Sequence, residues 1–258
     1  MNYVPTKAHR YFIWLHIKNL ILIRYRGAYL GLMWIILEPL MYLLILGFVF
    51  ATFNKAPIKE YVLYLFSGLI PWQFLERAVL SMTDSITQNA VFIRRIRTPY
   101  IYFPLIQLGV AFVDFIIAFS ILLLFFLLYR AEWHIPMVVL PLSIMAWMII
   151  VAGLGILLAV LFIFFQDIKP IIQMGLMLLL FTSTIFFKPD VFYGDSVKLK
   201  ILQYDPVCYW ANLFQKPIFY GIWPDLTDWI VCLMSGLILL SAALMLYYKL
   251  KDKFYYYV

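Results

Sequence analysis

Residues Met137 to Phe165 read MVVLPLSIMAWMIIVAGLGILLAVLFIFF and contain no charged side chain. At about 1.5 Å per residue, a helix of this length is longer than the roughly 30 Å of hydrocarbon in a bilayer. The rest of the chain agrees, because 66% of its 258 residues are apolar and only 13% are charged. A soluble domain has about 25% charged residues. The sequence therefore predicts an all-α membrane protein and excludes a soluble enzyme or a disordered chain.

Five further stretches have the composition of a membrane span. They are Ala28–Phe53, Tyr61–Thr83, Ile101–Tyr129, Ile171–Phe187 and Trp229–Tyr248. Six helices of about 20 residues fit easily within the chain, and an even number of crossings places both termini on one side. Pro71 lies inside the second of these stretches, so we expect a kinked helix there. The sequence thus predicts one membrane domain of six transmembrane helices over residues 28–248.

The distribution of basic residues predicts the side on which the termini lie. Short basic loops resist translocation and stay in the cytoplasm. With the N-terminus inside, the inner segments hold more Lys and Arg than the outer ones and include Arg94, Arg95 and Arg97. We therefore expect both termini, including a tail over residues 249–258, in the cytoplasm. The net charge of +7 then reflects loops that face anionic lipid rather than nucleic acid.

Residues 1–27 have the composition of a helix that lies on a membrane surface. Apolar residues such as Ile13 and Ile17 are interrupted by His16 and Lys18. This mixture suits the interface between lipid and water better than a seventh crossing. We expect an N-terminal amphipathic helix in the inner interface.

A second segment outside the spans, residues 89–98, reads NAVFIRRIRT. Asn89 can cap the start of a helix, and Pro99 biases Thr98 away from the helical region. The apolar positions of the segment are Phe92, Ile93 and Ile96, and its basic positions are Arg94, Arg95 and Arg97. This pattern predicts a short basic helix parallel to the membrane. An ordinary cytoplasmic loop whose arginines extend toward lipid headgroups explains the segment equally well.

Residues 188–228 form the longest segment between spans and contain many aromatic residues and prolines. So many aromatic side chains would be a liability in water, whereas a half-inserted hairpin or the headgroup belt removes most of that exposure. We expect short re-entrant or interfacial helices on the outer face. An aromatic belt that never contacts substrate is the alternative.

The sequence carries no recognisable catalytic or metal-binding motif. It lacks the GxxxxGK[ST] loop that holds nucleotide phosphates, and it lacks HExxH and GxSxG. Its three histidines are scattered, and Cys208 and Cys232 form no motif. We therefore expect no catalytic residue, no metal and no cofactor on this chain. Asp114 in mid-span is the best position for a proton-coupled carrier, but no inverted repeat accompanies it.

Several short motifs together resemble one known family. In chain order they are Arg24–Gly27, Leu30–Trp34, Glu38–Pro39, Gly68–Trp72, Asn89 with Arg94, Arg95 and Pro99, Asp167–Ile168, and Tyr204–Pro206. In this order, over nearly the whole chain, they resemble the membrane subunits of type-two ABC exporters for lipid-linked polysaccharides. That family includes O-antigen, capsule and teichoic acid permeases. The chain departs from the family pattern at Glu38, Gln166, Asp205 and Gln215, and at Asp205 the family more often has Asn.

The resemblance implies a homodimer with twelve spans, joined on the cytoplasmic face by two separate ATP-binding subunits. ATP and Mg²⁺ would then bind to those partners and not to this chain. The resemblance also implies that residues 89–98 are a coupling helix, seated in a cleft of the ATPase beside the N-terminal helix. The residues expected to couple to the ATPase are Asn89, Phe92, Ile93, Arg94, Arg95, Ile96 and Arg97.

A lipid-linked polysaccharide requires two kinds of contact from such a subunit. Cationic side chains near the inner interface can hold a pyrophosphate headgroup, and aromatic faces can contact sugars without binding any one of them tightly. The expected headgroup residues are Arg24, Arg26, Arg94 and Arg95, with pairing to ordinary lipid headgroups as the alternative. The expected pore-lining residues are Trp34, Tyr42, Phe186, Phe187 and Tyr193, with core packing as the alternative for each.

The function expected from this resemblance is ATP-driven export of lipid-linked polysaccharide, O-antigen first, across the inner membrane of a Gram-negative bacterium. Teichoic acid, capsule, and small-lipid or drug permeases of the same type are nearby alternatives. A membrane-embedded transferase acting on lipid carriers is the alternative from another class. Such an enzyme would need acidic residues such as Glu38, Asp114 and Asp167 for its chemistry.

Overall fold

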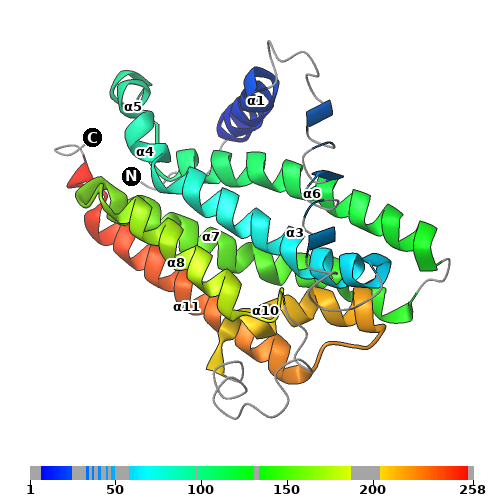
Figure 1. Ribbon diagram of the computed structural model, residues 1–258. Coiled ribbons are helices and arrows are strands. Elements are labelled where there is room, and N and C mark those ends of the chain that lie inside the picture. The colour runs from blue at the N-terminus through cyan, green and yellow to red at the C-terminus, as the bar shows by residue number, and fades with distance from the viewer. Residues whose placement is uncertain are drawn as a thin grey trace.

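The computed structural model is a bundle of long helices that lie side by side (Figure 1). It describes residues 7–24, 33–34, 37, 40–41, 45, 48–49, 58–96, 98–130, 134–186 and 204–254. Across these residues all regular structure is helical. The elements are α1 (Lys7–Arg24), α3 (Ile58–Thr83), α4 (Ser85–Gln88), α5 (Ala90–Ile96), α6 (Tyr102–Arg130), η2 (Ile135–Val139), α7 (Leu140–Phe164), α8 (Ile168–Thr182), α10 (Pro206–Gln215), η4 (Lys216–Tyr220) and α11 (Leu226–Leu250).

Three helical stretches are long and apolar enough to cross a membrane. They are Tyr102–Tyr129, Ile135–Phe164 and Leu226–Leu250. Helix α8 is apolar but has only 15 residues, and α3 is long but carries Glu76 and Arg77. Most of the first predicted span, Ala28–Phe53, lies outside the part of the chain that the structure describes. The all-helical membrane class is thus confirmed.

Helix α3 forms the centre of the bundle. Every residue from Tyr61 to Ile70 is buried, which is the pattern of a helix covered on all sides. Helices α6, α7, α8 and α10 all contact it. The helix continues through Pro71, whose carbonyl accepts a hydrogen bond of 3.0 Å from the indole nitrogen of Trp147 on α7.

Helices α7 and α11 pack together along most of their length (Figure 1). Gly153 on α7 permits this approach, because a Cβ atom there would lie only 2.6 Å from the backbone nitrogen of Leu240. Gly236 on α11 likewise faces Ile150, because a Cβ atom at Gly236 would lie 3.1 Å from the Ile150 side chain. Small residues that let two backbones come close are typical of helix contacts in membranes.

The two ends of the bundle are built from different segments. At one end, which we call the α4–α5 end, Ile86, Ile93, Phe103, Tyr247 and Phe254 share an apolar cluster. Phe254 is fully buried, so the chain folds back onto the bundle just after α11. The opposite end, which we call the α10 end, holds α10 and η4 (Figure 1).

Candidate functional site

Helix α5 lies within the segment predicted to be a short basic helix. Asn89 joins it to α4, because its side-chain amide donates to the carbonyl of Ser85 at 2.7 Å. The carbonyl of Asn89 in turn accepts from the backbone of Ile93 at 3.0 Å. Thr98 lies outside the helix, as expected for the residue before Pro99. Asn89 thus ends one short helix and begins the next.

The predicted apolar ridge of α5 packs against its own chain. Ile93 is buried in the apolar cluster at this end. The ring of Phe92 lies 5.9 Å from that of Phe12 and 5.4 Å from that of His16, both on α1. These contacts fix the position of α5 relative to the bundle and to α1.

The exposed face of α5 carries Val91, which is 64% exposed, and Arg94. The backbone of Arg95 and Ile96 is helical, but their side chains and all of Arg97 lie outside the description. Of the predicted coupling residues whose side chains are described, Arg94 is exposed, whereas Ile93 is buried and Phe92 is partly buried.

Helix α1 packs along α6 (Figure 1). Gly109 on α6 makes room for Ile17, because a Cβ atom at Gly109 would lie 2.5 Å from the Ile17 side chain. At the end of α1, Arg24 forms an ion pair of 2.5 Å with Asp114. Arg24 therefore neutralises the mid-span carboxylate that the sequence singled out.

This ion pair changes the interpretation of the predicted headgroup residues. Arg24 is 45% exposed, but its charge is already balanced by Asp114 within the same chain. Arg26 lies outside the described residues, and the side chain of Arg95 is not described. Of the four predicted arginines, the structure describes the side chains of Arg24 and Arg94.

Two of the predicted pore-lining residues, Trp34 and Phe186, lie in the described part of the chain. Trp34 is 44% exposed, whereas Phe186 is buried and stacks on Phe181 with ring centroids 5.2 Å apart. The carbonyl of Phe186 accepts a hydrogen bond from the Tyr61 hydroxyl. Phe186 thus packs in the core. Tyr42, Phe187 and Tyr193 lie outside the described residues.

At the α10 end, Asp205 begins α10 as its N-cap. Its carboxylate accepts a hydrogen bond of 2.9 Å from the backbone nitrogen of Val207, and Pro206 follows at the first helical position. Burial raises the pKa of Asp205 above its ordinary value. The buried carboxylate therefore serves the helix through its acceptor oxygen rather than through its charge.

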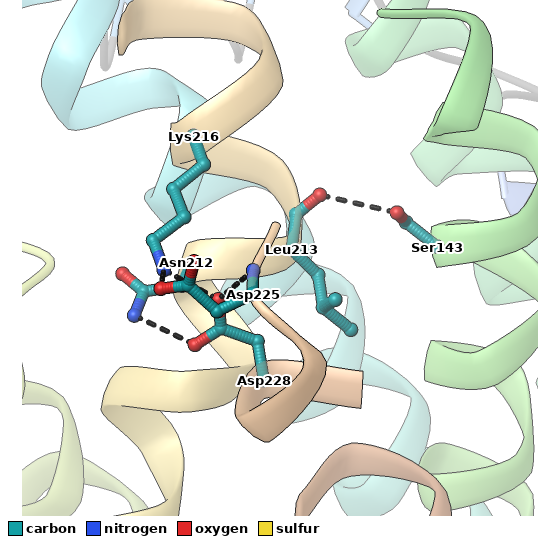
Figure 2. Close-up of polar contacts among 6 residues, drawn as sticks. All are labelled: Ser143, Asn212, Leu213, Lys216, Asp225 and Asp228. Carbon is teal, nitrogen blue, oxygen red and sulfur yellow. Dashed lines mark hydrogen bonds and ion pairs between the residues drawn. The ribbon is translucent and has the colours of Figure 1, made fainter. Parts of the chain in front are cut away.

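A polar cluster joins α10 to the start of α11 (Figure 2). Lys216 forms ion pairs with Asp225 and, at 2.6 Å, with Asp228, while the amide of Asn212 donates to Asp228 at 3.0 Å. Asp228 also accepts from the backbone nitrogen of Asp225 in a capping box. Asp228 is 1% exposed, so the cluster holds a buried carboxylate with several donors.

Two effects act in opposite directions on the pKa of Lys216. Burial lowers it, but hydrogen bonds and attraction from Asp225 and Asp228 outweigh burial, so the pKa of Lys216 is raised. Sequence patterns missed this cluster, because separations of nine and twelve residues match no helical repeat. The turn at Gly221, with φ of 66°, brings α11 back toward α10.

Asp84 and Lys169 form another ion pair, at the α4–α5 end. Asp84 lies between α3 and α4, and Lys169 lies in the first turn of α8. The sequence pointed to the neighbouring Asp167–Ile168 pair but not to Lys169 as a partner for Asp84. The contact spans 85 residues of sequence, so only the fold could reveal it.

The cavities and charges of the described residues do not form an enzyme-like site. The best-formed pocket, lined by Gly68, Trp72, Trp147 and Trp210 among others, has room for nothing much larger than water. No group of three His, Cys, Asp or Glu side chains among these residues could hold a metal. The ion pairs described above join segments of this chain to one another.

Comparison with known proteins adds the family context. Residues 11–219 match the model of the family described as ABC-2 type transporter. The chain is 25% identical over 245 residues to the O-antigen export system permease protein RfbA of Klebsiella pneumoniae. It is 21% identical over 233 residues to the protein of the same name from Myxococcus xanthus. Each match covers 90% of this chain and 89% of the relative.

Proposed function

Because the chain belongs to the ABC-2 type transporter family, as a membrane permease without an ATPase domain of its own, we propose that it exports lipid-linked polysaccharide, with O-antigen as the first choice. The observation that carries this proposal is the similarity to O-antigen export permeases over nearly the whole chain. The family and the permease role are established by the same comparisons. The substrate is our proposal.

An ABC permease needs an ATPase partner, and α5 is the surface that we propose for it. Helix α5 is braced by Phe92 against α1 and by Ile93 against the apolar cluster, while Val91 and Arg94 face outward. A helix held in this way can transmit a displacement of its outer face as rigid-body motion. Arg94 on that face can steer an acidic partner surface during docking.

The proposed arrangement is a homodimer with six spans in each chain and two ATPase subunits. Three apolar helices are long enough to cross a membrane, and in this proposal α3, α8 and the Ala28–Phe53 stretch form the other crossings of each chain. The basic composition of residues 89–98 favours the cytoplasm for the α4–α5 end and for both termini. The membrane would be the inner membrane of a Gram-negative bacterium.

We keep the substrate contacts proposed from the sequence, but the structure changes which of those residues are the better candidates. Among the predicted headgroup residues whose side chains are described, Arg94 is the one that is exposed at the α4–α5 end. Arg24 is better assigned to holding α1 on α6 through Asp114. Trp34, which is 44% exposed, suits a sugar-contacting role better than the buried Phe186.

The test combines genetics with purification. Deletion of the gene should abolish surface polysaccharide, and complementation with the chain should restore it. A protein with a nucleotide-binding GxxxxGK[ST] motif should copurify with the tagged chain, and its ATP hydrolysis should be required for restoration. Unchanged surface polysaccharide in the deletion strain would overturn the proposed substrate, and absence of a copurifying ATPase would overturn the proposed mechanism.

A further inference from the structure

The Asp84–Lys169 ion pair joins two segments that the chain itself does not connect directly. Asp84 is 13% exposed and immediately precedes α4, whereas Lys169 is 37% exposed and belongs to α8. The pair therefore links the α4–α5 segment, which we propose as the ATPase-binding surface, to α8.

The ion pair explains the charges of Asp84 and Lys169 better than a stabilising role in their own helices does. Asp84 stands at the N-cap position of α4, yet its side chain makes no capping hydrogen bond. Lys169 stands in the first turn of α8, where the helix dipole favours an anion, and that turn holds no acidic residue. The contact between the two side chains explains why position 84 is acidic and position 169 is basic.

The α4–α5 segment is built as one unit behind its outer face. The carbonyl of Asp84 accepts from the backbone of Gln88 at 3.0 Å, and Asn89 bonds to both α4 and α5. Ile86 on α4 and Ile93 on α5 are buried in the same apolar cluster. A displacement of α5 therefore carries Asp84 with it.

Helix α8 packs on the bundle along one side, through Leu176 and the partly buried residues Ile168, Ile172, Leu179 and Leu180. Leu176 is the one residue buried on this helix. Its large exposed side chains are Ile171, Met174, Met177, Leu178 and Phe181. Helix α8 is bounded by a turn at Gln166–Asp167 and by extended backbone at Ser183. Helix α8 has fewer contacts with α3 and α7 than α11 has with α7, so it is the less constrained of the two in a rigid-body movement.

We propose that the Asp84–Lys169 ion pair carries movement of the α4–α5 segment to α8 during transport. The proposal rests on the function proposed above, in which an ATPase binds α5, and it assigns to both residues a positioning role. Lys169 is partly exposed, so solvent screens the pair and its contribution to folding stability is modest. Reversing a charge should therefore uncouple α8 without unfolding the protein.

The first test is a charge swap in the deletion strain. Lys169→Glu and Asp84→Lys are compared singly and together, with Lys253→Glu, an exposed position at the same end, as the matched control. We expect each single variant to keep its bound ATPase and ATP hydrolysis but to lower surface polysaccharide by about tenfold. The double swap should restore most of the export, and the control should match the natural protein.

Two results of the charge swap would overturn the proposal. Export at the natural level in both single variants would show that the ion pair transmits no movement to α8. A double swap as defective as the single variants, with normal protein yield, would show that the two side chains act separately. Copurification of an ATPase with the natural protein is measured before any variant is made. If the natural protein binds no ATPase, the proposed function itself fails.

The second test replaces the ion pair with a covalent bridge. Asp84→Cys and Lys169→Cys are combined and bridged by a short thiol-reactive reagent in inside-out vesicles of the producing strain; the natural Cys208 and Cys232 are both buried. Export is measured as ATP-dependent protection of the polysaccharide from an added sugar-cleaving enzyme. Bridging should raise export from the lowered level of the unbridged variant. Continued ATP hydrolysis with export still low after bridging would contradict the proposal.

Discussion

At the scale of single residues, Asp205 shows how a buried acid can serve as a helix cap although burial disfavours its charged form. Its oxygen accepts from Val207, and burial raises its pKa. Asn offers the same acceptor oxygen without the charge, which fits the family's more frequent Asn at this position.

We therefore predict opposite results for two substitutions of Asp205. Asp205→Asn should leave thermal stability in detergent unchanged or higher, since the capping oxygen stays and the buried charge is removed. Asp205→Ala should lower stability by about 1 kcal/mol, because the cap is lost. Equal destabilisation by Asn and Ala would mean that the charge itself stabilises α10.

Lys216 leads to a prediction that depends on pH. Lys216→Met leaves the buried carboxylate of Asp228 without its cation and should destabilise the protein by roughly 3 kcal/mol. The raised pKa of Lys216 means that its contribution is complete below its ordinary value of 10.5 and is lost as pH rises through the folded-state pKa. The difference in melting temperature between the natural protein and the variant should be constant from about pH 7 to pH 10 and shrink above.

The control for this prediction is Lys249→Met, at an exposed position on α11. Such a surface substitution should change stability by no more than about 0.5 kcal/mol. A stability difference for Lys216→Met that already disappears near pH 8 would contradict the assigned ion pairs.

At the scale of elements, the contact between α7 and α11 depends on the absence of a side chain at Gly153. Gly153→Ala places a methyl group against the backbone of Leu240 and should cost about 1–3 kcal/mol. Gly175→Ala on α8 is the matched control, since nothing lies within 4 Å of its Cβ position. Thermal unfolding should separate the two variants, and equal tolerance would show that the helices do not approach this closely.

The two faces of α5 should behave differently when altered. Ile93→Ala removes a buried side chain and should lower stability by at least about 2 kcal/mol while the folded protein still binds its ATPase. Arg94→Glu lies on the exposed face and should lower the melting temperature less than Ile93→Ala does while reducing copurification of the ATPase. The reverse pattern would assign the inner ridge, rather than the outer face, to the partner.

The sequence predicted elements better than it predicted their contacts. The long apolar runs of α6, α7 and α11 indicate spans because length and composition suffice for that inference. The segment around Asn89 was expected to be helical, and α5 lies within it. The inward direction of Phe92 and Ile93 could not be predicted, because a helix of seven residues has too few positions to show which side its neighbours cover.

The charged residues show the same limit. Asp114 was recognised as unusual from its place in a span, but its partner Arg24 lies 90 residues away. Asp84 and Lys169, and Lys216 with Asp228, likewise meet only through the fold. Local patterns identify costly charges, whereas tertiary structure decides which opposite charge offsets them.

At the scale of the whole molecule, the account describes a permease that is driven from the α4–α5 end. The family match and the similarity to O-antigen export permeases establish the permease role, and the braced α5 supplies the surface proposed for the ATPase. The α10 end, with its internally paired Lys216 cluster, presents no comparable basic helix in the part of the chain that the structure describes.

The most direct measurement is photo-crosslinking from one position at each end of the bundle. A photoreactive amino acid replaces Val91, which is 64% exposed on α5, or Tyr204, which is 86% exposed beside α10. The account predicts a covalent adduct between position 91 and the ATPase subunit, and none from position 204. Adducts from position 204 instead of position 91 would contradict the central claim that the ATPase docks on α5.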